Sequence, residues 1–168
     1  MSLDSMRDLL VRELRDLYSA GTMVLKALPA LASAVTTRPL RHLLVEYSHE
    51  AEAQLDRLEF IFAELGSDPW GLRSRGMEGL VDESVVLLTE HADQAVREAA
   101  ITAQALRIGH FLMAGYQTAC RHARTQWVDT LVEPLTVSLA EIQATAAQLT
   151  TMVEHMTPSP PLEAASPA

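Results

Sequence analysis

Cysteine and aromatic residues are scarce in this chain. Cys120 is its single cysteine, which excludes an internal disulfide and leads us to expect a reducing compartment, the cytoplasm. Aromatic residues make up only 5% of the 168 residues, and the 48% hydrophobic share is rich in alanine and leucine. Such a composition favours packed helices over sheets.

Positive charge and long apolar runs are also lacking. Lys26 is the only lysine and the net charge is −9, which argues against binding to nucleic acid through phosphate neutralisation. No uncharged apolar run approaches the roughly 18 residues that a membrane span needs. The charged start, MSLDSMRDLLVRELRD, does not have the form of a secretory signal. We therefore expect a single globular domain that binds neither nucleic acid nor membranes.

Hydrophobic residues recur at helical spacing along most of the chain, and a few punctuating residues interrupt them. Thr37 is a candidate N-cap, Pro39 suits a first helical turn, and Gly66 is typical of a helix end. Pro134 lacks an N–H, which predicts that the last helix begins near it or bends there. The pattern predicts long helices over residues 4–34, 37–65, 93–124 and 129–156, and a short helix over residues 77–91.

Four long helices with one longer crossover predict an all-α fold. The expected architecture is a ferritin-like four-helix bundle whose short crossover helix lies between the second and third long helices. We assign residues 1–156 to this bundle. Residues 157–168, TPSPPLEAASPA, are expected to form a disordered tail rich in Pro, Ala and Ser.

Glu46 and His49 form a Glu-x-x-His pair, the spacing that ferritin-like bundles use at di-metal centres. A helix turns about 100° per residue, so with Tyr47 facing the core, Glu46 lies about 100° away and His49 about 200° away. The pair therefore points mainly at water, where charged side chains normally lie. Glu50, about 60° from Tyr47 by the same count, is closer to the core.

Several segments, taken in order, resemble the YciE/YciF-type ferritin-like family, a bacterial group linked to stress responses. They run from Glu13 to Val153 and include ELRDLYSA, LKALPALA, QLDRLEFIF, MEGLVDES, GHFLMAGYQT and LTTMV. The resemblance implies a ferritin-like bundle that forms a homodimer in the cytoplasm of a bacterium. It also implies that, in members with a metal site, carboxylates and histidines of the four long helices converge on the bundle centre.

The ligand positions implied by this resemblance have mostly lost their donor atoms. Gly21, Gly109 and Leu112 stand where family members have carboxylates, and Tyr47 stands where they often have histidine. A glycine inside a helix costs about 1 kcal/mol relative to alanine. Neutral drift or close helix approach explains both glycines. In the alternative, Gly21 and Gly109 make room for the Tyr47 ring, and Leu112 completes an apolar plug at the vacated site.

The inward metal-ligand candidates that remain are Glu50, His110 and Glu141. A di-metal centre needs about four carboxylates and two imidazoles, so we predict no bound cofactor. The alternative is iron or manganese held weakly by these three residues. His110 lies one turn from Leu106 and Ala114, which predicts a buried imidazole that is more often a satisfied core residue than a ligand. We expect His110 to hydrogen-bond with Glu50, Tyr47 or Glu141, and the Tyr47 hydroxyl to hydrogen-bond with Glu50, His110 or Glu141. Ser138 and Thr145 are near Glu141 on the same helix and extend this network.

The function that these observations predict is non-enzymatic. No nucleophile elbow, phosphate loop or dinucleotide fingerprint occurs in the sequence, and Cys120 has no catalytic signature around it. We expect a ferritin-like bundle with a decayed di-metal site, acting through its surface and its dimer in a stress-related structural or interaction role, with an unknown protein partner. The alternatives are a metal protein with an altered site and a binder of a small apolar ligand in the vacated centre.

Overall fold

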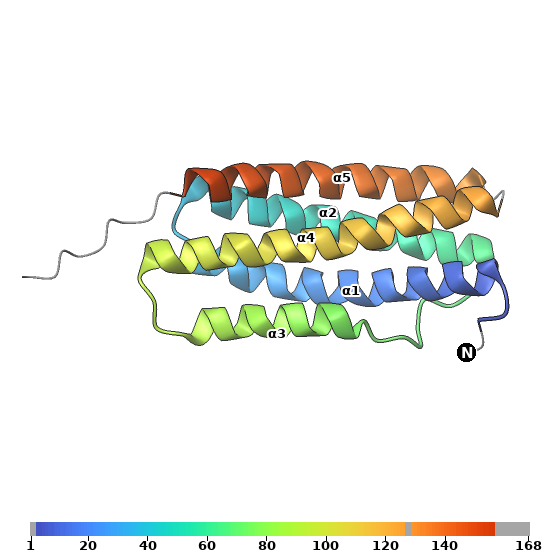
Figure 1. Ribbon diagram of the computed structural model, residues 1–168, viewed down its shortest axis with the longest axis horizontal. Helices are drawn as coiled ribbons and strands as arrows, with labels where there is room; N and C mark the ends of the chain where they lie inside the picture. The colour runs from blue at the N-terminus through green and yellow to red at the C-terminus, as the bar shows by residue number, and fades with distance from the viewer. Residues whose placement is uncertain (1–2, 127–128, 157–168) are drawn as a thin grey trace, which may run out of the picture.

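A computed structural model describes residues 3–126 and 129–156 of the chain. Five α-helices and no strand occur within these residues, which confirms the all-α prediction (Figure 1). The residues of the expected C-terminal tail lie outside the described part of the chain. The helices are α1 (Met6–Ala34), α2 (Arg38–Leu65), α3 (Arg75–Thr89), α4 (Gln94–Thr125) and α5 (Asp129–His155).

The four long helices α1, α2, α4 and α5 lie side by side (Figure 1). α1 packs against α2 and α4, and α5 packs against the same two helices, so the contacts close into a ring in which α1 and α5 are diagonal. α3 lies outside this ring, on α1 and α4. The chain order therefore places the short helix between the second and third long helices, as the crossover pattern predicts.

The core is a continuous leucine-rich seam between the long helices. Leu14, Val24 and Leu44 are completely buried, at the helical spacing seen in the sequence. Tyr47 and Phe62, both on α2, are the largest of the fully buried side chains. Cys120, on α4, is also buried, and its thiol is free.

Local sequence signals fix some of the helix ends. Ser5 caps α1, because its hydroxyl accepts a 3.1 Å hydrogen bond from the Asp8 N–H. Gly66 ends α2 in the left-handed conformation at φ 59°, which glycine adopts without a steric penalty. Pro134 lies inside α5, five residues after Asp129, so the helix runs through the proline.

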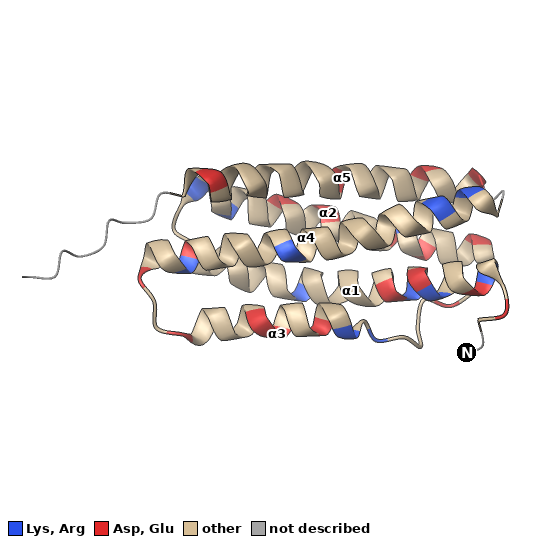
Figure 2. Cartoon of the chain, viewed as in Figure 1, with Lys and Arg blue, Asp and Glu red and all other residues tan. Residues whose placement is uncertain are grey.

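The charged residues are unevenly distributed along α1. Figure 2 shows them gathered in the N-terminal half of this helix, and Lys26 is the one charged residue beyond Asp16. No helix in the described part of the chain is both long and apolar enough to cross a membrane.

Candidate functional site at the bundle centre

Tyr47 of α2 lies in the centre of the ring, with no exposed surface. Its hydroxyl oxygen is 3.8 Å from the point that a Cβ on Gly109 of α4 would occupy, and Ala146 of α5 is 3.9 Å from the same point. Leu112, one turn after Gly109, is also buried, at 2% exposure. The Tyr47 hydroxyl and Gly109 therefore lie side by side, at the position where the sequence predicts a plug.

The Tyr47 hydroxyl does not find the hydrogen-bond partner that the sequence led us to expect. It is fully buried, and no partner for it lies among the described residues. Burial raises the pKa of Tyr47 well above its ordinary value, and the negative charge of Glu50 adds to the rise. Tyr47 thus fills the centre mainly as an apolar ring.

Gly21 does not serve the role predicted for it. A Cβ at this position of α1 would lie 3.0 Å from Cδ2 and 3.5 Å from Cγ of Leu55, not against Tyr47. The missing side chain therefore makes room for a leucine of α2, so Gly21 is not part of the predicted pocket for Tyr47.

Glu141 of α5 is held by Arg57 of α2 in a bidentate ion pair. Arg57 Nη1 lies 2.7 Å from Glu141 Oε2, and Nη2 lies 2.7 Å from Oε1. Gln54 donates a third hydrogen bond to Glu141 at 3.2 Å, and Arg57 Nη1 also donates to Ser138 at 3.2 Å. About a quarter of each charged side chain is exposed, at 26% and 25%. Glu141 therefore already has a cationic partner from its own chain.

Arg57 was absent from the residues singled out in the sequence, although a signal for it existed. Glu50, Gln54 and Arg57 are spaced by four and three residues, so they share one side of α2. At about 100° of rotation per residue, Arg57 lies on the same side of α2 as Glu50.

Glu50 faces α5 as well. It accepts a 2.7 Å hydrogen bond from the Thr145 hydroxyl and is half-buried. Burial raises the pKa of Glu50, the Thr145 hydrogen bond opposes the rise, and the nearby Glu141 carboxylate reinforces it. Ser138 and Thr145, which the sequence placed near Glu141, hydrogen-bond to Arg57 and Glu50 respectively.

Tyr116 of α4 adds a second buried phenol to this network. Burial raises its pKa strongly, and a hydrogen bond with Ser138 acts in the opposite direction. The polar centre therefore extends from α2 through α5 to α4.

His110 is exposed, which corrects the prediction of a buried imidazole. Its neighbours one turn away explain the error, because Ala114 is exposed and Leu106 is only half-buried. The buried seam of α4 passes through Ile108, Gly109 and Leu112, and His110 lies roughly 150° from the middle of that seam. The structure does not bring His110 together with Glu50 and Glu141.

His49 and Glu46 point at solvent, as the helical count predicts. Their side chains are 68% and 52% exposed, and His49 Nδ1 lies 3.8 Å from Glu46 Oε1 on the same helix. The Glu-x-x-His pair is a surface pair of α2.

The donor set of the centre does not fit a di-metal ion site. Gly109 and Leu112 have no donor atoms, and both oxygens of Glu141 bond to Arg57. Across residues 3–126 and 129–156, no three His, Cys, Asp or Glu side chains form a group that could hold a metal ion. The positive charge at this position comes from the guanidinium of Arg57.

A second polar cluster, at the end of the bundle, was not foreseen from the sequence. Glu98 of α4 is buried and accepts hydrogen bonds from Thr36 N at 2.5 Å, Thr36 Oγ1 at 2.7 Å and Thr37 N at 3.1 Å. The Thr37 hydroxyl and Gln94 Nε2 also donate to it. Burial alone would raise the pKa of Glu98, but the hydrogen bonds dominate and lower it to about 2. Thr37 stands at the N-cap position of α2, yet its hydroxyl bonds to Glu98 and not to its own helix.

Comparison with known proteins places these features in a family. The family model described as a domain of unknown function, DUF892, matches residues 5–159. The chain belongs to this family. Protein YciF of Escherichia coli strain K12 is 26% identical over 151 residues, which cover 89% of this chain and 91% of YciF. These findings confirm the resemblance to the YciE/YciF type.

Solved structures agree with the fold. YcfI of Rhodopseudomonas palustris, described as a candidate structural protein, has a TM-score of 0.86 at 35% identity, covering 89% of this chain and 96% of YcfI. The E. coli stress protein YciF has a TM-score of 0.87 at 25% identity, covering 91% and 97%. A protein from Xanthomonas campestris shares the fold at 17% identity, with a TM-score of 0.70 and coverage of 89% and 90%.

Proposed function

We propose that this chain is a non-enzymatic ferritin-like bundle protein in which side chains have replaced the di-metal centre. On this proposal, Tyr47 fills the space at the centre and Arg57 supplies the positive charge. The protein then acts through its surface, as a structural or interaction component of a stress response. We propose the cytoplasm as its location and a homodimer as its assembly, on the basis of the family resemblance.

The observation that carries the proposal is the Arg57–Glu141 pair. Two hard cations need several carboxylates around them, whereas one guanidinium satisfies both oxygens of a single carboxylate. Arg57 reaches both oxygens of Glu141 at 2.7 Å and crosses from α2 to α5 to do so. A metal ion that used Glu141 would have to displace this bidentate partner.

Two relatives support the structural and stress-related part of the proposal. YciF of E. coli is described as a stress protein, and YcfI of R. palustris as a candidate structural protein. The structural match with this chain covers 97% of YciF and 96% of YcfI. Their descriptions suggest the same kind of role here.

Metal analysis tests the proposal directly. The full chain, purified without chelator and desalted after incubation with Fe²⁺ or Mn²⁺, should retain far less than one equivalent of metal. Its thermal midpoint should not rise with either ion, because only an ion that binds the folded state more tightly than the unfolded state raises the midpoint. Retention of two equivalents of iron or manganese would overturn the proposal and return the chain to the metal-binding alternative.

A second experiment tests whether a small apolar ligand binds in the bundle centre. Small apolar molecules such as benzene enter and stabilise bundles that contain dry cavities. The four hollows described along this chain are lined by other residues than Tyr47 and Gly109. We expect benzene to leave the thermal midpoint unchanged, and a saturable rise would favour the apolar-ligand alternative.

A further inference from the structure

Trp70, in the loop between α2 and α3, is the most exposed of the large hydrophobic side chains described. Its side chain is 65% exposed. The indole nonetheless has a fixed neighbour, because it meets the ring of Tyr18 edge to face at a centroid distance of 5.1 Å and an interplanar angle of 87°. A large aromatic surface held open to solvent in this way suits an interaction site.

Tyr18 is itself held in place from two sides. Its hydroxyl donates a 2.7 Å hydrogen bond to Glu59 of α2, and its ring packs edge to face on Phe62 at 6.3 Å. The Tyr18–Trp70 pair is therefore a rigid aromatic corner that would lose little conformational entropy on binding a partner.

A hollow of about 190 Å³ lies at this corner, and we call it the Trp70 hollow. One wall is formed by residues 18–26 of α1, and the other by the loop that contains Trp70. Its lining includes Tyr18, Met23, Lys26, Pro69 and Trp70. Lys26 is the only charged residue in the second half of α1, so the hollow combines aromatic surface with one isolated positive charge.

We propose that the Trp70 hollow binds the proline-rich segment Pro158–Glu163 of a second copy of this chain. The segment reads PSPPLE and contains the spacing Pro-x-x-Pro between Pro158 and Pro161. Proline-rich segments of this spacing adopt the extended polyproline II helix and dock in grooves lined by tryptophan and tyrosine. The inference does not depend on the metal state of the bundle centre.

Charge complements the aromatic contact. Glu163 is the only charged side chain in residues 157–168, and Lys26 is the only one on its stretch of α1. Tyr18 and Lys26 are eight residues apart on α1, about 12 Å along the axis. Polyproline II rises about 3.1 Å per residue, so Pro160 to Glu163 spans about 9 Å and Pro158 to Glu163 about 16 Å. The proline contacts and the ion pair can therefore form together.

The prolines of the segment cannot reach the aromatic corner of their own chain. Met156 lines a hollow with Leu40 at one end of α2, while the hydroxyl of Tyr18 bonds to Glu59 near the other end. Leu40 and Glu59 are 19 residues apart, about 28 Å along the helix. Pro161 lies five residues beyond Met156, which gives a reach of about 16 Å. The prolines that pack on Tyr18 and Trp70 must therefore come from another molecule.

Fluorescence of Trp70 tests the proposal. The chain has two tryptophans, so the full chain with Trp127→Phe reports on Trp70 alone. Titration with the synthetic peptide TPSPPLEAASPA should give a saturable change in Trp70 emission. The same peptide with both Pro160→Ala and Pro161→Ala should bind about tenfold more weakly or worse, because it loses the pre-formed extended conformation and the ring contacts. An unchanged emission, or equal binding of the two peptides, would overturn the proposal.

A charge swap tests the assigned orientation without touching the aromatic corner. Lys26→Glu should weaken the native peptide about two- to fivefold, as expected for an exposed ion pair. The peptide with Glu163→Lys should recover that loss on the Lys26→Glu chain. Failure of the swap to recover binding would overturn the assigned pairing.

A tryptophan-free copy tests whether the tail acts between molecules. The full chain with Trp70→Phe and Trp127→Phe, titrated into the Trp127→Phe chain, should reproduce the emission change seen with the peptide. The same titrant with Pro160→Ala and Pro161→Ala is the matched control and should reproduce little of it. If both titrants act equally, the copies meet through another surface and the proposal is wrong.

Discussion

Arg57 donates one hydrogen bond to each carboxylate oxygen of Glu141, and the two 2.7 Å contacts join α2 to α5. The pair lies beside Glu50, whose pKa burial raises. An arginine fork is stronger and more specific for a carboxylate than a lysine would be, because its two N–H groups match the spacing of the two oxygens. One side chain therefore neutralises Glu141 and fixes the contact between two helices.

Removal of the Arg57 charge should destabilise the bundle. Arg57→Met keeps much of the side-chain length but leaves Glu141 partly buried without a counter-charge, so we expect a loss of about 1–3 kcal/mol in the free energy of unfolding. Urea denaturation followed by helical circular dichroism measures it. The double variant Arg57→Met with Glu141→Leu should be more stable than Arg57→Met alone, because it removes the unpaired charge.

The matched control for this prediction is Arg73→Met. Arg73 pairs with Glu78, but its side chain is 70% exposed, so the loss should stay within about 0.5 kcal/mol. If Arg57→Met and Arg73→Met cost the same, the central pair does not compensate a buried charge.

Removal of the Tyr47 hydroxyl should stabilise the protein. This hydroxyl is buried and has no partner among the described residues, a condition that costs about 1–3 kcal/mol. Tyr47→Phe keeps the ring and removes the unsatisfied group, so the free energy of unfolding should rise by on the order of 1 kcal/mol. Tyr18→Phe is the control, because Tyr18 donates to Glu59 at 2.7 Å and should lose about 0.5–1.5 kcal/mol. A loss of stability in Tyr47→Phe would mean that the phenol has a partner in solution.

The two glycines of the central part of α4 should respond in opposite ways to alanine. A Cβ at Gly109 would meet its nearest atoms at 3.8 and 3.9 Å, which is ordinary contact, so Gly109→Ala should gain up to about 1 kcal/mol of helix propensity. A Cβ at Gly115 would lie 2.7 Å from Cδ2 of the buried Leu17, so Gly115→Ala should lose stability through overpacking. Thermal unfolding of the two variants measures the contrast.

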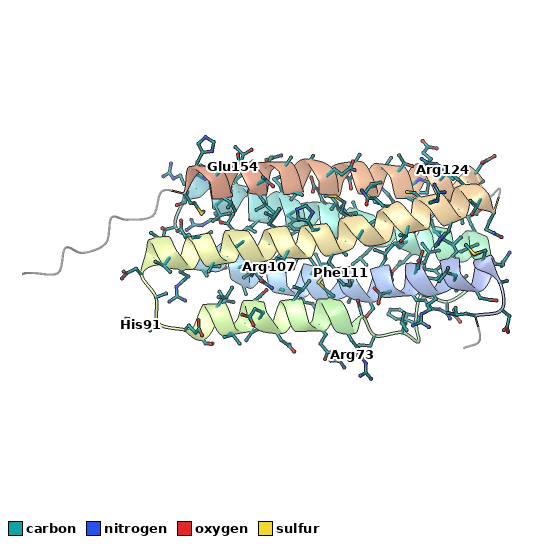
Figure 3. All side chains as sticks on the ribbon, in the orientation of Figure 1. Arg73, His91, Arg107, Phe111, Arg124 and Glu154 are labelled. Atoms are coloured by element: carbon teal, nitrogen blue, oxygen red, sulfur yellow. The ribbon has the colours of Figure 1, made fainter. Side chains whose placement is uncertain are left out.

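Phe111 of α4 limits the size of the side chain that α3 can carry where the two helices meet. Figure 3 labels Phe111 above the start of α3, with Arg73 below. A Cβ at Gly76 of α3 would lie 2.6 Å from Cε2 of Phe111, so Gly76 allows α3 to approach α4 closely. Gly76→Ala should loosen α3 more than Gly79→Ala, because no atom lies within 4 Å of a Cβ at Gly79. Hydrogen exchange of the α3 amides distinguishes the two variants.

Helix positions could be predicted from the sequence because their signals are local. Thr37 with Pro39 and Gly66 mark the ends of α2, and the ends observed are Arg38 and Leu65. The outward direction of His49 followed from the rotation per residue alone. The short helix α3 begins at Arg75, two residues before the predicted start at residue 77, since helix ends have the weakest sequence signals.

The candidate site was harder to predict because its contacts are distant in sequence. Arg57 and Glu141 are 84 residues apart, and Glu98 and Thr36 are 62 apart. No local pattern pairs such residues. His110 was misplaced because the neighbours used to judge its burial, Leu106 and Ala114, are themselves half-buried and exposed. Gly21 was misassigned because a missing side chain does not reveal which residue takes its space.

Glu98 should make the stability of the bundle depend on acidic pH. Its pKa is about 2 in the folded protein, below the ordinary value of 4.5, because Thr36, Thr37 and Gln94 donate hydrogen bonds to its carboxylate. A depressed folded pKa stabilises the folded state at pH values above the unfolded pKa. This contribution is therefore complete above about pH 5 and is lost as the pH falls from about 4.5 towards 2.

Glu98→Gln should cost about 1.5–3 kcal/mol near neutral pH, since it removes the charge from several hydrogen bonds. The difference in unfolding free energy between the native chain and Glu98→Gln should then shrink between about pH 5 and pH 3. Glu52→Gln, at an exposed position of α2, serves as the matched control and should show a much smaller pH dependence. A constant difference across this range for Glu98→Gln would mean that the carboxylate of Glu98 does not hold the loop between α1 and α2 through its charge.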